Sequence, residues 1–114
     1  MNQKGSIISR QRYCYVKIHQ RGNEVIVAAC DEELLGRTIY HGDLKIQISE
    51  SFYKGKKIPL EYIVDYIKRG TIINLIGNNV VDEVSKSIPI ISDAAIEIGG
   101  IKHVQIVTVR YDRK

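Results

Sequence analysis

The stretch AACDEELLGR, residues 28–37, places a thiol directly before three carboxylates. Cys30 would be a nucleophile only as its thiolate, which a helix N-terminus favours but the adjacent acids oppose, because negative charge raises the pKa of a thiol. Asp31 and Glu33 could serve as acid and base or as metal ligands, although acids two residues apart on a short helix do not share a face. We favour a buried Cys30 at a strand end, with Asp31 capping a short helix that ends at Gly36.

Polar groups also interrupt two apolar segments. His103 and Gln105 alternate with Val104 in a strand-like segment, so both should lie on one face of a sheet. Asn74 lies inside a β-branched apolar run, where its amide needs hydrogen-bond partners or faces a site. Gly77 follows that run directly and could expose backbone N–H groups to an anion, or simply allow a turn; no glycine-rich nucleotide motif accompanies it.

The net charge of +4 is concentrated at the two ends of the chain. Basic ends can bind nucleic-acid phosphates, and an aromatic–basic strand face such as that of Tyr15 and Lys17, with Tyr13 and His19, can stack bases. The alternatives are that charged termini only keep the ends solvated, and that the strand face makes ordinary cross-strand pairs. The candidate nucleic-acid contacts are Lys4, Arg10, Arg12, Tyr15, Lys17, Arg110, Arg113 and Lys114.

The hydrophobic pattern predicts an α+β domain with a partly antiparallel sheet of about six strands and two or three helices. Residues 13–19 and 24–30 should form one hairpin, and 94–110 a second that turns at Gly99-Gly100. Between them we expect a half-buried strand at 42–50 with Leu44, Ile46 and Ile48 inward, then a basic loop at 51–59 and a helix at 59–70. A buried strand at 71–77, for which a helix is the alternative, and a helix at 78–87 follow.

A chain of 114 residues that is 44% hydrophobic and 26% charged should form a single globular domain. We expect a basic arm at 1–12, the domain at 13–110 and a basic tail at 111–114. We see no signal peptide or membrane span, which predicts a cytoplasmic protein. The two cysteines and three histidines lack metal-ligand spacing, so neither a disulfide, a metal nor a cofactor is expected.

Several ordered stretches together resemble the small archaeal family catalogued as domain of unknown function 424. CDEELLG, NLIG and GGIKHVQ carry most of the resemblance, which extends from about Tyr13 to Val109. It implies a cytosolic protein whose family has no assigned activity. The positions that match the family pattern are Cys30, Asp31, Glu33, Leu34, Leu35, Gly36, Asn74, Leu75, Gly77, Gly100, His103 and Gln105.

Three functions follow from these observations. The one we favour is a non-enzymatic module that binds RNA, on the ribosome or another translation assembly, because of the basic ends and the aromatic–basic strand. The second is a small enzyme whose pocket unites Cys30, Asp31, Glu33, Asn74, His103 and Gln105. The third is an adaptor that forms homodimers through an apolar patch or an open strand edge.

Overall fold

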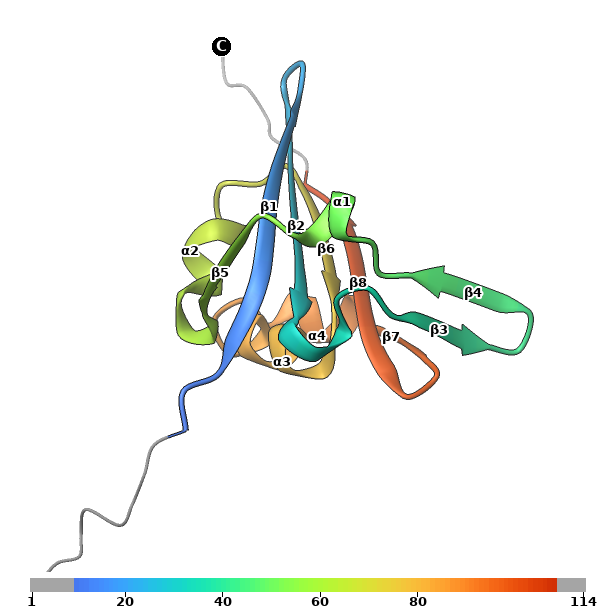
Figure 1. Cartoon of the computed structure of the whole chain (residues 1–114). Coiled ribbons are helices and arrows are strands. Elements are labelled where there is room, and N and C mark those ends of the chain that lie inside the picture. Colours follow the sequence, from blue (N-terminus) through green and yellow to red (C-terminus); the bar gives the residue numbers. More distant parts are fainter. Residues whose placement is uncertain (1–9, 109–114) are drawn as a thin grey trace, which may run out of the picture.

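The computed structural model of the chain describes residues 10–108, which form a six-stranded mixed sheet and a separate two-stranded hairpin (Figure 1). The strand order in the large sheet is β5-β1-β2-β6-β8-β7, and only β2 and β6 run parallel. The elements of this sheet are β1 (Tyr13–Arg21), β2 (Glu24–Asp31), β5 (Lys56–Pro59), β6 (Ile72–Ile76), β7 (Ile96–Ile98) and β8 (Ile101–Val107). The small sheet pairs β3 (Thr38–His41) with β4 (Leu44–Gln47).

Two apolar clusters cover the two faces of the large sheet, because successive side chains of a strand point to opposite sides. On one face pack the helices α2 (Ile63–Ile67), α3 (Asn78–Ser87) and α4 (Ile90–Ala94), with buried Ile63, Val80, Val84 and Ile91. On the other face lies a second cluster around Cys30 and Ile76. Tyr53 of the short helix α1 (Glu50–Tyr53), Ile39 of β3, and Ile48 between β4 and α1 belong to it. Figure 1 shows the β3–β4 hairpin projecting away from the sheet.

The α+β class and the main sequence patterns are confirmed. The two antiparallel hairpins β1–β2 and β7–β8 form where the alternation and the Gly99-Gly100 pair predicted them. Both glycines have positive φ, +57° and +80°, as a tight two-residue hairpin turn requires. The buried strand β6 and the helix α3 also lie where the sequence predicted them.

Other expectations were wrong. Residues 51–59 are not a loop, because they contain the end of α1 and the edge strand β5. The strand β4 is shorter than predicted and belongs to the projecting hairpin, so Leu44 is 48% exposed rather than inward. The helix predicted at 59–70 is confirmed in position but is shorter, a 3₁₀ turn, Leu60–Tyr62, that continues directly into α2. The sequence also gave no indication of β3 or α4.

Candidate nucleic-acid interface

Cys30, Asp31 and His103 do not converge in one site. In the sheet register Cys30 is next to Ile76, and Ile76 is next to His103, so roughly 10 Å and one buried isoleucine separate the thiol from the imidazole. Asp31 points to the opposite face of the sheet, where its carboxylate contacts α3. These side chains therefore do not form the pocket that the small-enzyme hypothesis requires.

The thiol of Cys30 is poorly placed for nucleophilic chemistry. Its side chain is fully buried, and burial, together with the negative charge of Asp31, raises its pKa to about 12. Burial also raises the pKa of Cys14 to about 12. The sequence argument named only the neighbouring acids as the cause, whereas burial is the larger effect. Glu33 is exposed, and Glu32 beside it forms an ion pair with Lys57 at 2.6 Å.

Asp31 is a helix cap, but of a different helix from the one expected. It makes no capping hydrogen bond to the 3₁₀ turn Glu32–Leu34 that follows it. Instead its two carboxylate oxygens accept the backbone N–H groups of Asn79, at 3.0 Å, and Val80, at 2.8 Å, in the first turn of α3. Burial raises the pKa of this carboxyl, while the two N–H donors act in the opposite direction. The anion bound by the backbone N–H groups that follow Gly77 is thus the protein's own carboxylate.

Asp31, Gly77 and Asn78 form what we call the capping corner. Gly77 has a φ of +127°, and a Cβ there would lie 2.3 Å from the carboxyl carbon of Asp31. Asn78 accepts the backbone N–H of Lys102 through its side-chain oxygen at 2.8 Å, and the N–H of Gly77 bonds to the Lys102 carbonyl. The three stretches that carry the family resemblance therefore meet here, where they join β2, α3 and the β7–β8 turn at Gly100.

Asn74 and His103, two further polar positions of the family pattern, also have partners within the protein. The side-chain oxygen of Asn74 accepts the hydroxyl of Tyr53 at 2.5 Å, which explains an amide inside an apolar strand. His103 donates from Nδ1 to the carbonyl of Leu75 at 2.8 Å. Gln105 is exposed beside Asn74, and Gly36 has a φ of +86° where the chain leaves the 3₁₀ turn.

Helix α1 covers part of the predicted aromatic–basic face of β1. The ring of His19 stacks on Phe52 with centroids 4.9 Å apart and bonds to the Phe52 carbonyl. Tyr15 is half-buried against the second cluster. Lys17 donates from Nζ to the carbonyl of Ser51 at 2.8 Å, but the side chain is only partly buried. Of this face, Tyr13 is 39% exposed and Lys17 is partly accessible to a ligand.

The N-terminal arm is attached to the domain at its last residues. The carbonyl of Arg12 accepts the N–H of Leu60, and the Arg12 guanidinium donates to the side chain of Asn79 at 3.1 Å. Arg10 and Arg12 also border a small hollow with Glu61 and Glu83, so acids partly offset their charge. The other basic positions of the two ends, Lys4, Arg110, Arg113 and Lys114, lie outside the described residues.

A groove lined by Val16, Lys17, Ile18, Gly55, Lys56, Tyr66 and Arg69 is the most basic hollow that we find in the described part of the chain; we call it the basic groove. Its volume is about 320 Å³, and it has no acidic side chain in its lining. Arg69 lies over the ring of Tyr66, 4.8 Å from its centroid. Within residues 10–108, none of its three cations forms a salt bridge.

The strand pairing creates this groove. β5 pairs with β1 only as far as Val16 and Lys56, so the outer edge of β1 is open from Lys17 onward within the described chain. Gly55 precedes β5 and passes so close to β1 that a Cβ would lie 2.4 Å from the Val16 carbonyl oxygen. Sequence reasoning found Lys17 but missed Lys56, Tyr66 and Arg69. The run KGKK was the available signal, and we had read it as a loop.

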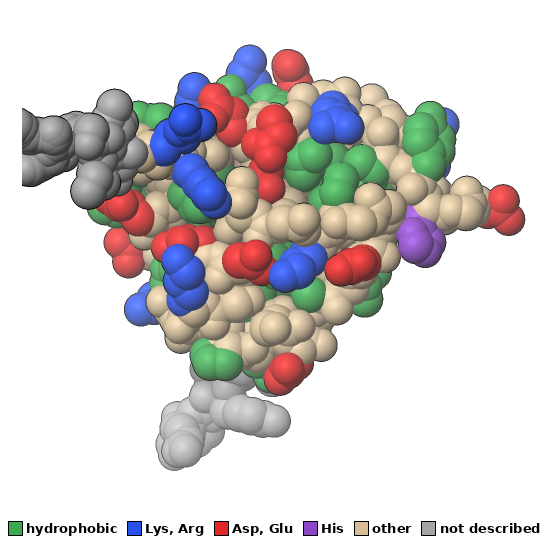
Figure 2. All heavy atoms as spheres, turned by 90° about the horizontal axis from the view of Figure 1, so that it is seen from below, with side chains coloured by type: hydrophobic (Ala, Val, Ile, Leu, Met, Phe, Trp, Pro, Cys, Tyr) green, Lys and Arg blue, Asp and Glu red, His purple; other side chains and the backbone are tan. Residues whose placement is uncertain are grey.

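Elsewhere basic and acidic side chains are mixed. Figure 2, which views the molecule from below, shows Lys and Arg interspersed with Asp and Glu over this surface. Two pairs account for part of the mixture: Lys86 with Glu83 at 3.1 Å, and Lys102 with Asp82 at 2.7 Å. Such neutralised surfaces attract polyanions weakly, so the basic groove is distinguished by its unpaired cations.

Within residues 10–108 we find neither a metal-binding arrangement of side chains nor a helix that could span a membrane. No group of three or more His, Cys, Asp or Glu side chains in this part of the chain is arranged to hold a metal ion. None of the described helices has the length and apolar character needed to cross a membrane.

The fold and the capping corner define a small α+β domain in which Asp31, at the end of β2, caps α3, the helix that follows the neighbouring strand β6. The chain belongs to the family described as protein of unknown function (DUF424), whose model matches residues 18–109. It is also similar to an uncharacterised conserved protein from Methanopyrus kandleri with a known crystal structure. The two share 26% identity and a TM-score of 0.71 over 90% of this chain and 98% of that one. No curated protein matches the chain.

Proposed function

We propose that this protein is a non-enzymatic module that binds single-stranded RNA in the basic groove. The observation that carries this proposal is the lining, which has no carboxylate: Lys56 and Arg69 are exposed cations, and Lys17 borders the groove from β1 with its ammonium bonded to the Ser51 carbonyl. Each cation that contacts a phosphate releases condensed counterions, which is the main source of affinity in such complexes.

The groove also offers an aromatic ring and free backbone groups. Tyr66 is half-buried, with Arg69 against its ring, and a base can stack on a tyrosine or on a guanidinium plane. The open edge of β1 beyond Val16 adds backbone N–H groups that can donate to phosphate or base oxygens. Cations, an aromatic ring and an open β-strand edge together suit single-stranded RNA, whose bases are free to stack, better than an RNA duplex, whose bases are paired.

A larger RNA assembly is the natural partner for such a surface. Arg10 and Arg12 lie near α3 and Leu60 and add two further cations outside the groove, although Glu61 and Glu83 border the same hollow. We propose that in the cell the protein associates with the ribosome or another translation assembly. Sedimentation of the tagged protein with ribosomal subunits at low salt, and its release at high salt, is the expected result; migration at the top of the gradient at low salt would contradict it.

The direct test measures binding of a fluorescent 12-nucleotide uridine RNA by anisotropy. The triple variant Lys17→Gln, Lys56→Gln, Arg69→Gln should bind at least about tenfold more weakly, since it removes three phosphate contacts. The matched control is Arg37→Gln, Lys45→Gln, Lys86→Gln, which lowers the net charge equally but lies outside the groove. Equal weakening in the two triple variants would show that only overall charge matters and would refute the groove.

The arm can be separated from the groove in the same assay. Removal of residues 1–9 should weaken binding by less than the groove variant does, because Lys4 is the one basic side chain among them. Loss of all binding on this removal, with the groove intact, would assign the contact to the arm instead.

A further inference from the structure

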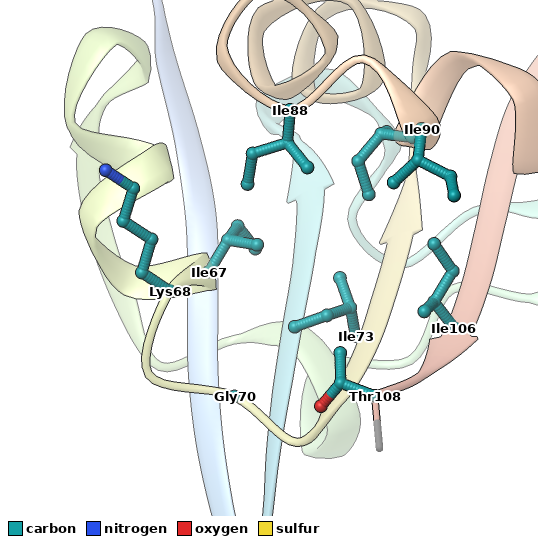
Figure 3. A pocket seen from close by; sticks show the side chains of 9 residues that line it. Ile67, Lys68, Gly70, Ile73, Ile88, Ile90, Ile106 and Thr108 are labelled. Carbon is teal, nitrogen blue, oxygen red and sulfur yellow. The ribbon is translucent and has the colours of Figure 1, made fainter. Parts of the chain in front are cut away.

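A second hollow has the opposite character to the basic groove. It lies between α2, α4, β6 and β8, has a volume of about 290 Å³, and is lined mainly by isoleucines (Figure 3). We call it the isoleucine groove. Its lining residues are Ile67, Lys68, Gly70, Ile73, Ile88, Ile90, Ile91, Ile106 and Thr108.

The rim of this groove is open to solvent, while Ile67, Ile73 and Ile91 in its wall are buried. Ile90 is 64% exposed at its rim, although isoleucine is among the residues most often buried. Figure 3 shows the side chains of Ile88, Ile90, Ile73 and Ile106 around one common space. An apolar hollow of this kind gains free energy when an apolar side chain displaces the water within it.

We propose that the segment 109–114, VRYDRK, binds the isoleucine groove. The groove includes Thr108 in its wall, so this segment starts at the groove itself. Thr108 is held there by two hydrogen bonds to the carbonyl of Thr71, one from its N–H at 2.7 Å and one from its hydroxyl at 3.0 Å. A second copy of the chain or another protein would have to find this groove by diffusion, whereas the attached segment has a high effective concentration there.

The composition of the segment fits the groove. Tyr111 follows Thr108 by three residues, and an extended chain spans roughly 10 Å over that distance, enough to bring the ring over the hollow. A tyrosine can bury its ring among isoleucines and leave its hydroxyl in water. Lys68 is the one charged residue of the lining, and Asp112, next to Tyr111, is the acid of the segment that can pair with it. This proposal does not depend on RNA binding.

Methyl NMR of the full chain tests the proposal. With labelled isoleucine methyl groups, we expect cross-relaxation between the ring of Tyr111 and the methyls of Ile73, Ile90 and Ile106. Ending the chain at Thr108, or introducing Tyr111→Ala, should shift these methyl signals. Tyr40→Ala is the matched control, because Tyr40 is 64% exposed on the projecting hairpin, and it should leave them unchanged.

A substitution in the isoleucine groove tests the same contact without altering the segment 109–114. Ile90→Glu alters an exposed side chain and should preserve the fold while abolishing the contacts of Tyr111; Ile96→Glu, at a residue that is 56% exposed on β7, should preserve them. The proposal is wrong if the truncation shifts only signals next to Thr108. It is also wrong if the methyl shifts depend on protein concentration, which would assign the groove to a second copy.

Discussion

The capping corner and the basic groove differ in how their polar groups are used. In the capping corner the carboxylate of Asp31 accepts two backbone N–H groups and is only 3% exposed. In the basic groove Lys56 and Arg69 are exposed cations that have no acidic partner within residues 10–108. The polar groups of the capping corner are therefore hydrogen-bonded within the protein, while these two cations of the basic groove remain available to a ligand.

This difference separates the residues that hold the fold together from those that can bind a ligand. CDEELLG, NLIG and GGIKHVQ carry the family resemblance, and all three stretches hold β2, α3 and the β7–β8 turn together. Their polar residues explain the architecture rather than a reaction. The groove residues come from β1, from Gly55 and the start of β5, and from α2 and the turn after it, and they belong to none of these stretches. Perturbing the corner should thus change stability alone, and perturbing the groove should change binding alone.

Gly77→Ala should have the largest effect on stability. The added Cβ would lie 2.3 Å from the carboxyl carbon of Asp31 at a φ of +127°, so strain and displacement of the cap should together cost about 4 kcal/mol. Urea unfolding measures this loss. Gly22→Ala is the control: it shares a positive φ, +56°, but has no atom nearby, and should cost about 1 kcal/mol. Equal losses for both glycines would show that the contact with Asp31 is unimportant.

Asp31→Ala should have the next largest effect. It leaves the N–H groups of Asn79 and Val80 without their acceptor at the buried start of α3, which should cost about 3 kcal/mol in urea unfolding. Glu33→Ala, two residues away and exposed, should change stability by less than about 0.5 kcal/mol. RNA affinity of the folded Asp31→Ala protein should remain that of the wild type. A large loss of affinity in this variant would place the corner in the binding site.

The smallest effect is expected when the folded protein is treated with a thiol reagent. With pKa values raised to about 12, Cys14 and Cys30 would be only about 10⁻⁴ thiolate at pH 8, and both side chains are fully buried. Iodoacetamide at pH 8 should therefore modify neither thiol in the folded protein within an hour, and both in guanidinium chloride. Rapid modification of Cys30 in the folded protein would restore the nucleophile hypothesis.

Much of the fold could be predicted from the sequence, because most of its strands alternate regularly and its turns have distinctive residues. β1, β2, β6, α3 and the β7–β8 hairpin follow directly from such patterns. β5 was missed because Lys56, Lys57 and Pro59 are poor strand formers that suit an edge, where only one neighbour must be paired. In the β3–β4 hairpin, β4 was predicted and β3 was not, because these four-residue strands bury few side chains.

The candidate site was harder to predict, since it depends on contacts between distant parts of the chain. Asp31 caps a helix that begins 47 residues later at Asn78, and no local pattern links the two. The basic groove combines Lys17, Lys56 and Arg69 only because β5 returns to pair with β1 and α2 packs beside it. Sequence reasoning placed the basic charge at the chain ends, where most of the positions lie outside the described residues.

The salt dependence of RNA binding tests the central claim most directly. The logarithm of affinity should fall with the logarithm of salt concentration, and the variant Lys17→Gln, Lys56→Gln, Arg69→Gln should have a slope shallower by about 2, since each lost phosphate contact on a single strand removes about 0.7. The control Arg37→Gln, Lys45→Gln, Lys86→Gln should keep the wild-type slope. Binding with the same slope in both triple variants, or no RNA binding by the wild type at low salt, would contradict the account.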